Sequence, residues 1–216
     1  MTSIRLPSAI SVGILIAIFV GQGGCGFARK TVSIGVVSEG QGRQIAAYAD
    51  LQPDTAPGKK ADMVMAGTRI PVNVLTSKFG PVFRILLRAH DETFETEVYR
   101  SGPTAFSLSE AGGDVYSPDV DLIRFPMQVG DEWTWEGAVS SGGVRRKATA
   151  RVKSTTANLY DNGVPMEAVR VDVALSLYSE GTKSPAARKL VFEFVPGKGI
   201  VRREFGDASV REPAQP

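Results

Sequence analysis

The residues whose types could support catalysis cluster around the chain's single histidine. His90 is followed by Asp91 and Glu92, and Glu95 and Glu97 complete the run DETFETE. Two carboxyl groups held close together act as acid and base in glycoside hydrolysis. Neighbouring residues of a strand point to opposite faces, however, and acidic residues at alternate positions are typical of a solvated strand face. We therefore expect a non-enzymatic protein without catalytic residues, and a carboxylate-dependent envelope hydrolase is the less favoured alternative.

Other patterns that support catalysis or metal binding are missing from the sequence. One histidine cannot form a multi-histidine metal site. The runs DVYSPDVD and DNG place acidic and amide groups near turns, but neither has the spacing of an EF-hand. No GxSxG motif accompanies His90. We expect His90 to be structural or exposed, and we predict neither a cofactor nor a bound metal.

The single cysteine, Cys25, indicates a location rather than a reaction. It follows the run AISVGILIAIFV, residues 9–20, which has Arg5 as the one charged residue before it. This run is too short to span a membrane as a helix. A basic start, a short apolar run and then small residues are typical of a secretory signal peptide. We predict that residues 1–24 form such a signal peptide.

The residues around the cysteine resemble the lipobox of bacterial lipoproteins. The two glycines before Cys25 match that pattern, whereas Gln22 stands where leucine is usual. The resemblance implies that Cys25 becomes the N-terminus and carries lipid, with more than one acyl chain needed for a stable anchor. Gly26 is not the Asp that favours inner-membrane retention, which implies the periplasmic side of the outer membrane. The alternatives are cleavage after Ala28, giving a soluble secreted or periplasmic protein, and an uncleaved membrane anchor.

Composition and charge narrow the class of protein further. Beyond Cys25 the chain has no cysteine, which excludes disulfides and cysteine metal sites in that part. The formal net charge of the 216 residues is +2, without the basic domain expected of a nucleic-acid-binding protein. Residues 144–216 carry 13 basic and 8 acidic side chains on expected strands. We interpret them as a solvated sheet face; the alternative is a cationic face that rests on anionic lipid or polymer.

Hydrophobic alternation predicts strands and no long helix. In AVRVDVALSLY, residues 168–178, every second side chain is apolar, and KLVFEFV, residues 189–195, repeats this pattern. The run PGKG, residues 196–199, is typical of a hairpin turn. We predict an all-β (β-rich) fold, an antiparallel curved sheet that forms an open half-barrel or a sandwich. Residues 42–51 are the best candidate for one short helix.

The chain is expected to form one folded domain. We predict an N-terminal tether over residues 25–35, a single β-rich domain over residues 36–207 and a flexible tail over residues 208–216. The proline- and glycine-containing stretches at residues 50–66 and 109–121 indicate loops.

Two tryptophans offer the best candidate for a ligand site. Trp133 and Trp135 lie two residues apart and therefore share a strand face, and Phe192 and Phe194 repeat this spacing. Aromatic side chains arranged in this way can line an apolar cavity. We expect the tryptophans to fill the core, and the alternative, for which these four residues are the best candidates, is a cavity that binds a hydrophobic ligand.

Three segments resemble a known family. FPMQVGDEWTWEG, NGVPMEAVRV and FVPGKGIVRRE, in this order within residues 125–205, are similar to segments of uncharacterised bacterial envelope lipoproteins of the DUF3108/TapB-like kind. The resemblance implies an all-β, half-barrel-like envelope protein, and more distantly the curved sheets of lipoprotein carriers of the LolA/LolB type. It carries over no functional residue.

The sequence as a whole predicts a non-enzymatic, lipid-anchored protein of the cell envelope. Its expected partners are the membrane, through the N-terminal lipid, and a hydrophobic ligand or another envelope protein. A secreted structural or interaction module without a ligand is the alternative.

Overall fold

The computed structural model describes the part of the chain that follows the predicted signal peptide and tether. The predictions for Cys25 and for residues 1–35 lie outside the described residues. Within the described part, no helix is both long and apolar enough to cross a membrane. The described residues are 44–51, 58–66, 68–161, 164–181, 184–206 and 208–211.

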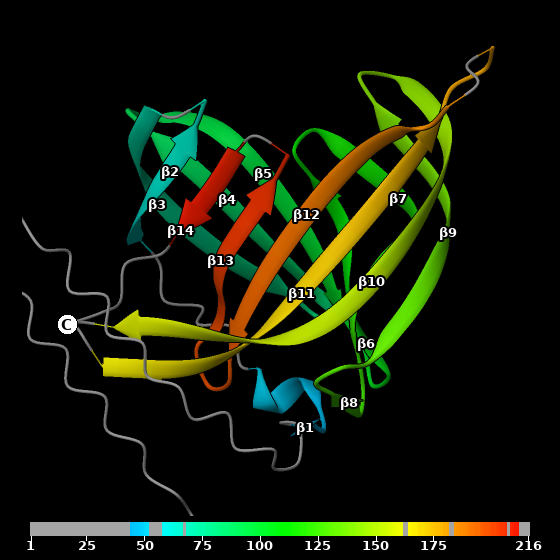
Figure 1. Ribbon diagram of the computed structural model, residues 1–216. Coiled ribbons are helices and arrows are strands. Elements are labelled where there is room, and N and C mark those ends of the chain that lie inside the picture. Colours follow the sequence, from blue (N-terminus) through cyan, green and yellow to red (C-terminus); the bar gives the residue numbers. More distant parts are fainter. Residues whose placement is uncertain are drawn as a thin grey trace, which may run out of the picture. The chain divides into compact units, whose positions relative to one another are not determined.

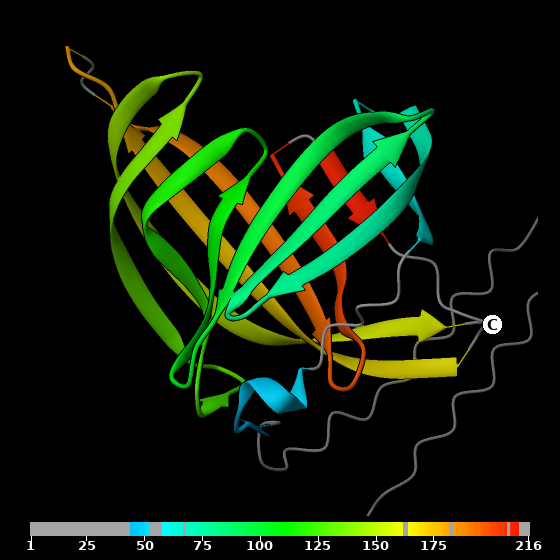
Figure 2. The same ribbon diagram turned by 180° about the vertical axis from the view of Figure 1, so that it is seen from behind.

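Antiparallel strands make up almost all of the described structure (Figure 1 and Figure 2). The all-β class predicted from the sequence is therefore confirmed. The elements in chain order are β1 (Gln44–Ile45), the 3-10 turn η1 (Tyr48–Asp50), β2 (Lys59–Met65), β3 (Thr68–Phe79), β4 (Val82–Ala89), β5 (Glu92–Ser101), β6 (Ala105–Ala111), β7 (Asp114–Arg124), β8 (Met127–Gln128), β9 (Glu132–Ser141), β10 (Val144–Asp161), β11 (Val164–Tyr178), β12 (Ala186–Val195), β13 (Gly199–Phe205) and β14 (Ala208–Arg211).

All of these strands except β1 and β8 belong to one curved sheet that closes into a barrel. Most neighbours in the sheet are also neighbours in the chain, as expected for hairpin-connected antiparallel strands. The closure comes from β7 and β9, which pair over four residues, Asp114–Ser117 with Ala138–Ser141. The predicted curved antiparallel sheet is confirmed, and its hydrogen-bonded ladder continues around the whole ring.

The core lies inside the ring because apolar side chains alternate along the strands. On β11, the residues from Val169 to Leu177 at alternate positions are almost completely buried. Between them, Arg170 and Asp172 point to the outer face and pair with each other. This is the period-2 pattern of a sheet with one face in the core and one in water.

The hairpin of β10 and β11 extends beyond its neighbours in the sheet (Figure 1). β9 pairs with β10 as far as Lys153, and β12 pairs with β11 from Val169 onward. The ends of the two strands, residues 157–161 and 164–168, pair only with each other within the described structure. We call these two segments the hairpin arm.

One end of the barrel is closed by short elements that lie outside the main sheet. β1 pairs with β8, and Ile45, Leu51 and Met127 are buried in the core cluster. The expected helix at residues 42–51 is reduced to η1, where Asp50 Oδ2 accepts hydrogen bonds of 2.9 Å from the backbone N–H groups of Ala46 and Ala47. We call this part of the barrel the plugged end.

Three segments expected to be loops or tail contribute strands. Residues 59–65, in the expected loop at 50–66, form β2, in which Ala61 and Met63 point into the core. Residues 109–121 contain a tight hairpin turn at 112–113 between β6 and β7. Residues 208–211, placed in the predicted tail, form β14, which pairs with both β13 and β2. β14 is therefore one of the strands that complete the ring.

Candidate functional site

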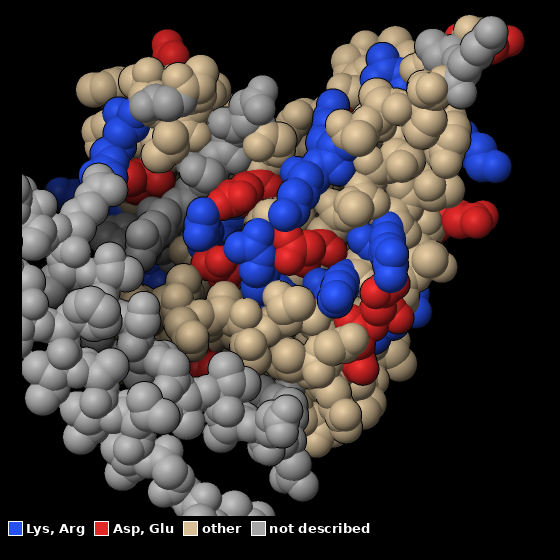
Figure 3. Space-filling model, viewed as in Figure 1, with Lys and Arg blue, Asp and Glu red and all other residues tan. Residues whose placement is uncertain are grey.

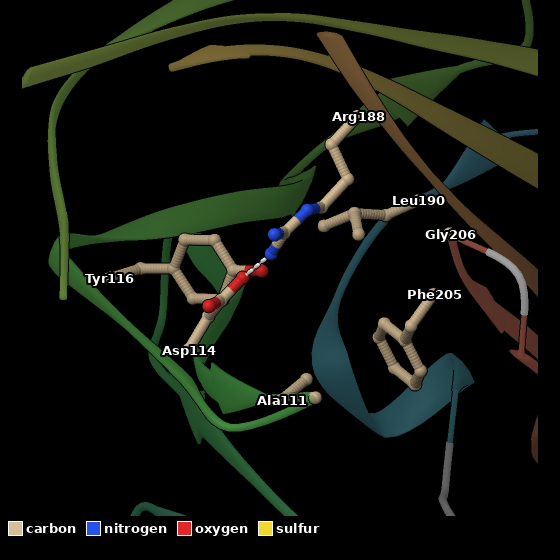
Figure 4. A pocket seen from close by; sticks show the side chains of 8 residues that line it. Ala111, Asp114, Tyr116, Arg188, Leu190, Phe205 and Gly206 are labelled. Carbon is tan, nitrogen blue, oxygen red and sulfur yellow. Dashed lines mark hydrogen bonds and ion pairs between the residues drawn. The ribbon is translucent and has the colours of Figure 1, made fainter. Parts of the chain in front are cut away.

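A pocket of about 290 Å³ (Figure 4) lies where β12 begins and β13 ends, at the end of the barrel opposite to the plugged end (Figure 1). It is formed where the β6–β7 turn faces the beginning of β12 and the end of β13. Its lining contains three polar and three small or apolar side chains together with two glycines: Asp114, Tyr116, Arg188, Ala111, Leu190, Phe205, Gly112 and Gly206.

Two glycines form the β6–β7 turn, and this turn sets the positions of Asp114 and Tyr116. Gly112 and Gly113 have φ angles of 61° and 74°, a left-handed conformation that glycine adopts without steric cost. Such a two-residue turn with positive φ suits the twist of a tight hairpin. It pairs Ala111 with Asp114 directly. Asp114 and Tyr116, two residues apart on β7, then point to the same side.

An ion pair crosses the pocket between β7 and β12 (Figure 4). Arg188 donates a hydrogen bond from its guanidinium to Oδ2 of Asp114. The Asp114 side chain is 2% exposed, whereas that of Arg188 is 35% exposed. The second carboxylate oxygen of Asp114, Oδ1, is buried and has no hydrogen-bond partner among the described residues. The pair therefore leaves one carboxylate oxygen of Asp114 without a partner in the wall of the pocket.

Tyr116 brings a second buried polar atom to the same pocket. Its side chain points toward the Asp114–Arg188 pair (Figure 4), and its ring meets that of Trp135 edge to face at 6.4 Å. The hydroxyl is buried and lacks a hydrogen-bond partner within the described part of the chain. Burial, reinforced by the nearby charge of Glu95, raises the pKa of Tyr116 above its usual range. The hydroxyl therefore keeps its proton and can donate as well as accept.

A layer of buried charge lies beside the pocket in the barrel interior. Glu95 accepts a hydrogen bond from the backbone N–H of Gly112, which lines the pocket. Two residues further along β5, Glu97 forms a fully buried ion pair with Arg203 at 2.9 Å and accepts a 2.7 Å hydrogen bond from the Tyr99 hydroxyl. We call Glu95, Glu97, Tyr99 and Arg203 the interior charge layer.

Electrostatics in this layer favour protonated groups. Burial raises the pKa of Glu95 above its usual value of 4.5, and the like charges of Glu97 and Glu110 act in the same direction. The Gly112 N–H and Arg203 oppose the rise without cancelling it. Burial, followed by the charge of Glu97, also raises the pKa of Tyr99 well above 10. Glu95 therefore keeps its proton to a higher pH than an ordinary carboxyl group does.

The two tryptophans lie where the ring closes. The indole N–H groups of Trp133 and Trp135 donate to the backbone carbonyls of Asp121 and Pro118 on β7, at 3.0 and 3.1 Å. Because proline has no N–H, the β7–β9 ladder ends just before Pro118. The indoles continue the connection between β7 and β9 beyond that point. We call this contact, the four-residue pairing with the two indoles, the seam.

A glycine makes room for the Trp135 ring at the seam. A Cβ atom at Gly137 would lie 2.6 Å from Cζ2 of Trp135 and 2.6 Å from the carbonyl oxygen of Ser117. Real Cβ atoms do not approach other atoms so closely, so a larger residue would push β7 and β9 apart.

The two phenylalanines of the predicted ligand site lie in the core. Phe192 and Phe194 are fully buried and pack against Tyr99 and Phe106. None of the four predicted aromatic residues lines the pocket described above. Their placement does not test binding, and the predicted hydrophobic site stays a prediction.

The acidic run around the histidine is divided by the fold. His90 is exposed in the β4–β5 turn, consistent with the expectation, and Glu92 is also exposed. Glu97 is instead completely buried, so the expected solvated face is wrong for this residue. Arg203, which faces it from β13, supplies the opposite charge that makes burial tolerable. Among the described residues, no cluster of three or more His, Cys, Asp or Glu could hold a metal ion.

Sequence analysis missed the polar residues of the pocket, although a signal for one of them exists. Leu190, Phe192 and Phe194 share one face of β12, and Arg188 continues the same alternation. A charged residue on the apolar phase of a strand indicates a buried polar site. For Asp114 and Tyr116 the signal was hidden, because they belong to a stretch whose glycines and prolines favoured a loop.

The outer face of β11, β12 and β13 carries a network of paired charges (Figure 3). Asp172 binds both Arg170 and Lys189 at 2.9 Å, and Glu193 lies 3.3 Å from Arg170 and 3.5 Å from Arg202. Burial alone would raise the pKa of Asp172, but the hydrogen bonds from Arg170 and Lys189 outweigh it and lower the pKa. Mutual pairing of these charges favours the solvated sheet face over a cationic binding face.

Comparisons with known proteins find structural likeness and no sequence family. No family model matches the chain, and no curated protein matches it. An inferred lipoprotein from Parabacteroides distasonis ATCC 8503 is similar at 12% identity and a TM-score of 0.45, covering 77% of this chain and 97% of that chain. The hypothetical lipoprotein YmcC from Escherichia coli K12 is similar at 13% identity and a TM-score of 0.44, covering 79% and 90%.

A third solved structure has a comparable likeness. An inferred exported protein with a YmcC-like fold from Bacteroides fragilis NCTC 9343 has 15% identity and a TM-score of 0.42, covering 78% of this chain and 98% of its own. Since no family model matches, the resemblance to envelope lipoproteins of the DUF3108/TapB-like kind stays a prediction.

Proposed function

We propose that this chain is a non-enzymatic lipoprotein of the bacterial cell envelope, anchored through acyl chains on Cys25. In this proposal the anchor lies in the outer membrane on its periplasmic side, and the barrel is a compact module that binds a ligand or a partner protein. The single observation that carries the proposal is the position of Cys25. It directly follows two glycines, a few residues after a short apolar run, and no other cysteine occurs in the chain.

The arrangement of the described residues supports a binding module with a packed interior more than a carrier that holds acyl chains inside the barrel. The interior of the ring holds tightly packed aromatic and aliphatic side chains, including Phe106, Phe192 and Phe194. Trp135 packs against Tyr116 and over Gly137, where a lipid carrier would need open apolar space. Binding by such a module takes place at its surface or in pockets at its ends.

Intact mass spectrometry of the full chain, purified from membranes of a bacterial host, tests the anchor. We expect a denatured mass equal to the chain from Cys25 plus acyl groups, and recovery in the outer-membrane fraction. The matched variant Cys25→Ser should lose the acyl mass and should no longer be recovered in the outer-membrane fraction. An unmodified chain beginning at Arg29 would instead mean simple secretion, and the lipid anchor would be wrong.

A native mass spectrum of the same sample tests whether a hydrophobic ligand is bound, as considered above for the two tryptophans and two phenylalanines. A mass excess that disappears on denaturation would indicate a bound lipid and favour a carrier. We expect no such excess, because the described core is filled with side chains.

A further inference from the structure

The pocket contains two buried polar atoms that the fold itself leaves without a partner. Asp114 is 1% exposed and Tyr116 is 3% exposed. Neither Oδ1 of Asp114 nor the Tyr116 hydroxyl has a hydrogen-bond partner among the described residues. Buried polar groups in folded proteins are nearly always hydrogen-bonded, to the protein or to something bound to it. Both atoms therefore indicate an occupant that brings polar groups of its own.

The charges of the pocket favour a neutral occupant. Asp114 and Arg188 already neutralise each other across the pocket. An anion would approach the Asp114 carboxylate as well as Arg188, and a cation would approach the Arg188 guanidinium as well as Asp114. Either one gains from one member of the pair and is repelled by the other. A neutral molecule can bind without breaking the pair.

The hydrogen-bonding groups match hydroxyl groups. Asp114 Oδ1 can only accept, the Arg188 guanidinium can only donate, and the protonated Tyr116 hydroxyl can do both. A hydroxyl group also donates and accepts. Two neighbouring hydroxyls on one molecule can thus donate to Asp114 and accept from Arg188 at the same time.

The remaining walls and the size limit the occupant further. Phe205, Leu190 and Ala111 provide apolar surface around the ion pair, suited to the C–H face of a small ring. The volume of about 290 Å³ is at the lower end of the range for small-molecule pockets. A long acyl chain would not fit, whereas one sugar-sized ring would.

We propose that this pocket binds a neutral polyhydroxyl molecule about the size of a monosaccharide, with Asp114, Arg188 and Tyr116 as its polar contacts. This site lies outside the anchor and outside the predicted aromatic site. Binding does not depend on lipidation of Cys25, so the Cys25→Ser chain should bind equally well even if the proposed anchor is wrong.

Saturation-transfer NMR on the full chain in detergent tests the proposal. The probes are D-glucose, D-galactose, D-mannose and N-acetyl-D-glucosamine, and the comparators are methyl phosphate, L-alanine and decanoate. We expect a saturable signal from at least one sugar, and at least tenfold weaker binding of each comparator. Tyr116→Phe removes one hydrogen bond and keeps the ring, so it should weaken the sugar about fivefold.

Matched variants separate a local effect from a general one. Tyr178→Phe makes the same change on an exposed tyrosine at the outer face and should leave the affinity unchanged. Ala111→Val adds bulk to the pocket wall and should abolish binding without touching a polar group. It also keeps the test decisive if Tyr116→Phe fails to fold, which thermal unfolding of each variant would show.

Three results would overturn the proposal. Absence of a signal from all four sugars would mean that water satisfies Asp114 and Tyr116. Sugar binding that survives both Tyr116→Phe and Ala111→Val would place the sugar elsewhere. Stronger binding of methyl phosphate, alanine or decanoate, sensitive to Tyr116→Phe, would show that the pocket binds a different chemical class.

Discussion

The two ends of the barrel differ in whether their buried polar groups have hydrogen-bond partners. At the plugged end, the buried Ser154 hydroxyl donates toward the carbonyl oxygens of Gln128 and Asp131 and accepts from the Gly130 N–H. Apolar side chains such as Leu51 fill the remaining space. At the pocket end, Asp114 and Tyr116 are equally buried but keep polar atoms without protein partners.

Because of this difference, the plugged end contributes to the stability of the sheet and the pocket end is suited to binding. Satisfied hydrogen bonds and apolar packing at the plugged end contribute to the free energy of folding. Unsatisfied buried groups at the pocket end cost free energy, and a bound molecule can supply the missing interactions. Substitutions at the two ends should therefore have different consequences.

The largest effect is expected where the interior charge layer is broken. Arg203→Met removes the cation that faces Glu97 and leaves a fully buried carboxylate uncompensated. We expect a loss of about 3–5 kcal/mol in the free energy of unfolding, measured by urea denaturation. The double variant Glu97→Gln with Arg203→Met should recover most of this loss. A double variant as unstable as the single one would show that the charge itself is not the cause.

A slightly smaller loss is expected at the plugged end. Leu51→Ala leaves a cavity in the packed cluster that also contains Ile45 and Met127. Truncations of this kind cost about 2–5 kcal/mol, and here we expect about 3. Sugar affinity at the pocket should not change. A coupled loss of affinity would mean that the two ends do not act separately.

At the seam, Gly137→Ala should destabilise the barrel by about 1–3 kcal/mol through overpacking. The added Cβ would meet the Trp135 ring and the Ser117 carbonyl. Gly102→Ala is the control, since a Cβ there makes an ordinary contact of 3.6 Å with the Ala105 carbonyl. Thermal unfolding and the fluorescence of the two tryptophans report the difference. Equal stability of both variants would show that β7 and β9 move apart at little cost.

Two tyrosine substitutions compare a satisfied hydroxyl with an unsatisfied one. Tyr99→Phe removes a hydrogen bond to the buried Glu97 carboxylate and should cost about 1.5–3 kcal/mol. Without ligand, Tyr116→Phe should not lower stability and should raise it by up to about 1 kcal/mol, because its hydroxyl lacks a partner. If Tyr116→Phe were as destabilising as Tyr99→Phe, ordered water would already satisfy the pocket.

The smallest effect concerns pH. Because the pKa of Glu95 is raised in the folded state, the fold binds this proton more tightly than the unfolded chain does. Stability from Glu95 is therefore fully present below about pH 4.5 and declines as pH rises through the folded pKa. Glu95→Gln should remove this decline, seen as a smaller drop in Tm than in the parent chain when pH rises from 4.5 to 7.

The exposed Glu92→Gln on the same strand is the control for that pH dependence, and it should follow the parent chain. A Glu95→Gln variant that also follows the parent would show that Glu95 ionises normally in the fold.

Much of the fold could be predicted from the sequence because its strands alternate clearly. The alternation from Val169 to Leu177 and the turn at residues 196–199 predicted β11, β12 and β13 correctly. β2 was missed because its apolar phase consists of Ala61 and Met63 alone, within a stretch of lysine, aspartate and proline.

The interior charge layer could not be predicted because strand irregularities decide which residues face inward. Alternation from Ile200 would place Arg202 inside, but the register shifts between Glu193 and Phe194 and turns Arg203 inward instead. On β5, the apolar residues Phe94 and Val98 compete with Tyr99 for the inner phase. The pocket itself requires β7 and β12 to meet across the ring, which no local pattern encodes.

The seam also determines where the strands of the barrel can separate. Tyr116, which lines the pocket, pairs with Val139 inside the four-residue ladder, and Asp114 pairs with Ser141. Separation of β7 from β9 at this point would expose the pocket, while the long hairpins of the opposite wall stay intact. A molecule bound between β7 and β12 would then hold the barrel closed, because its release from the site and the opening of the ring would be the same motion.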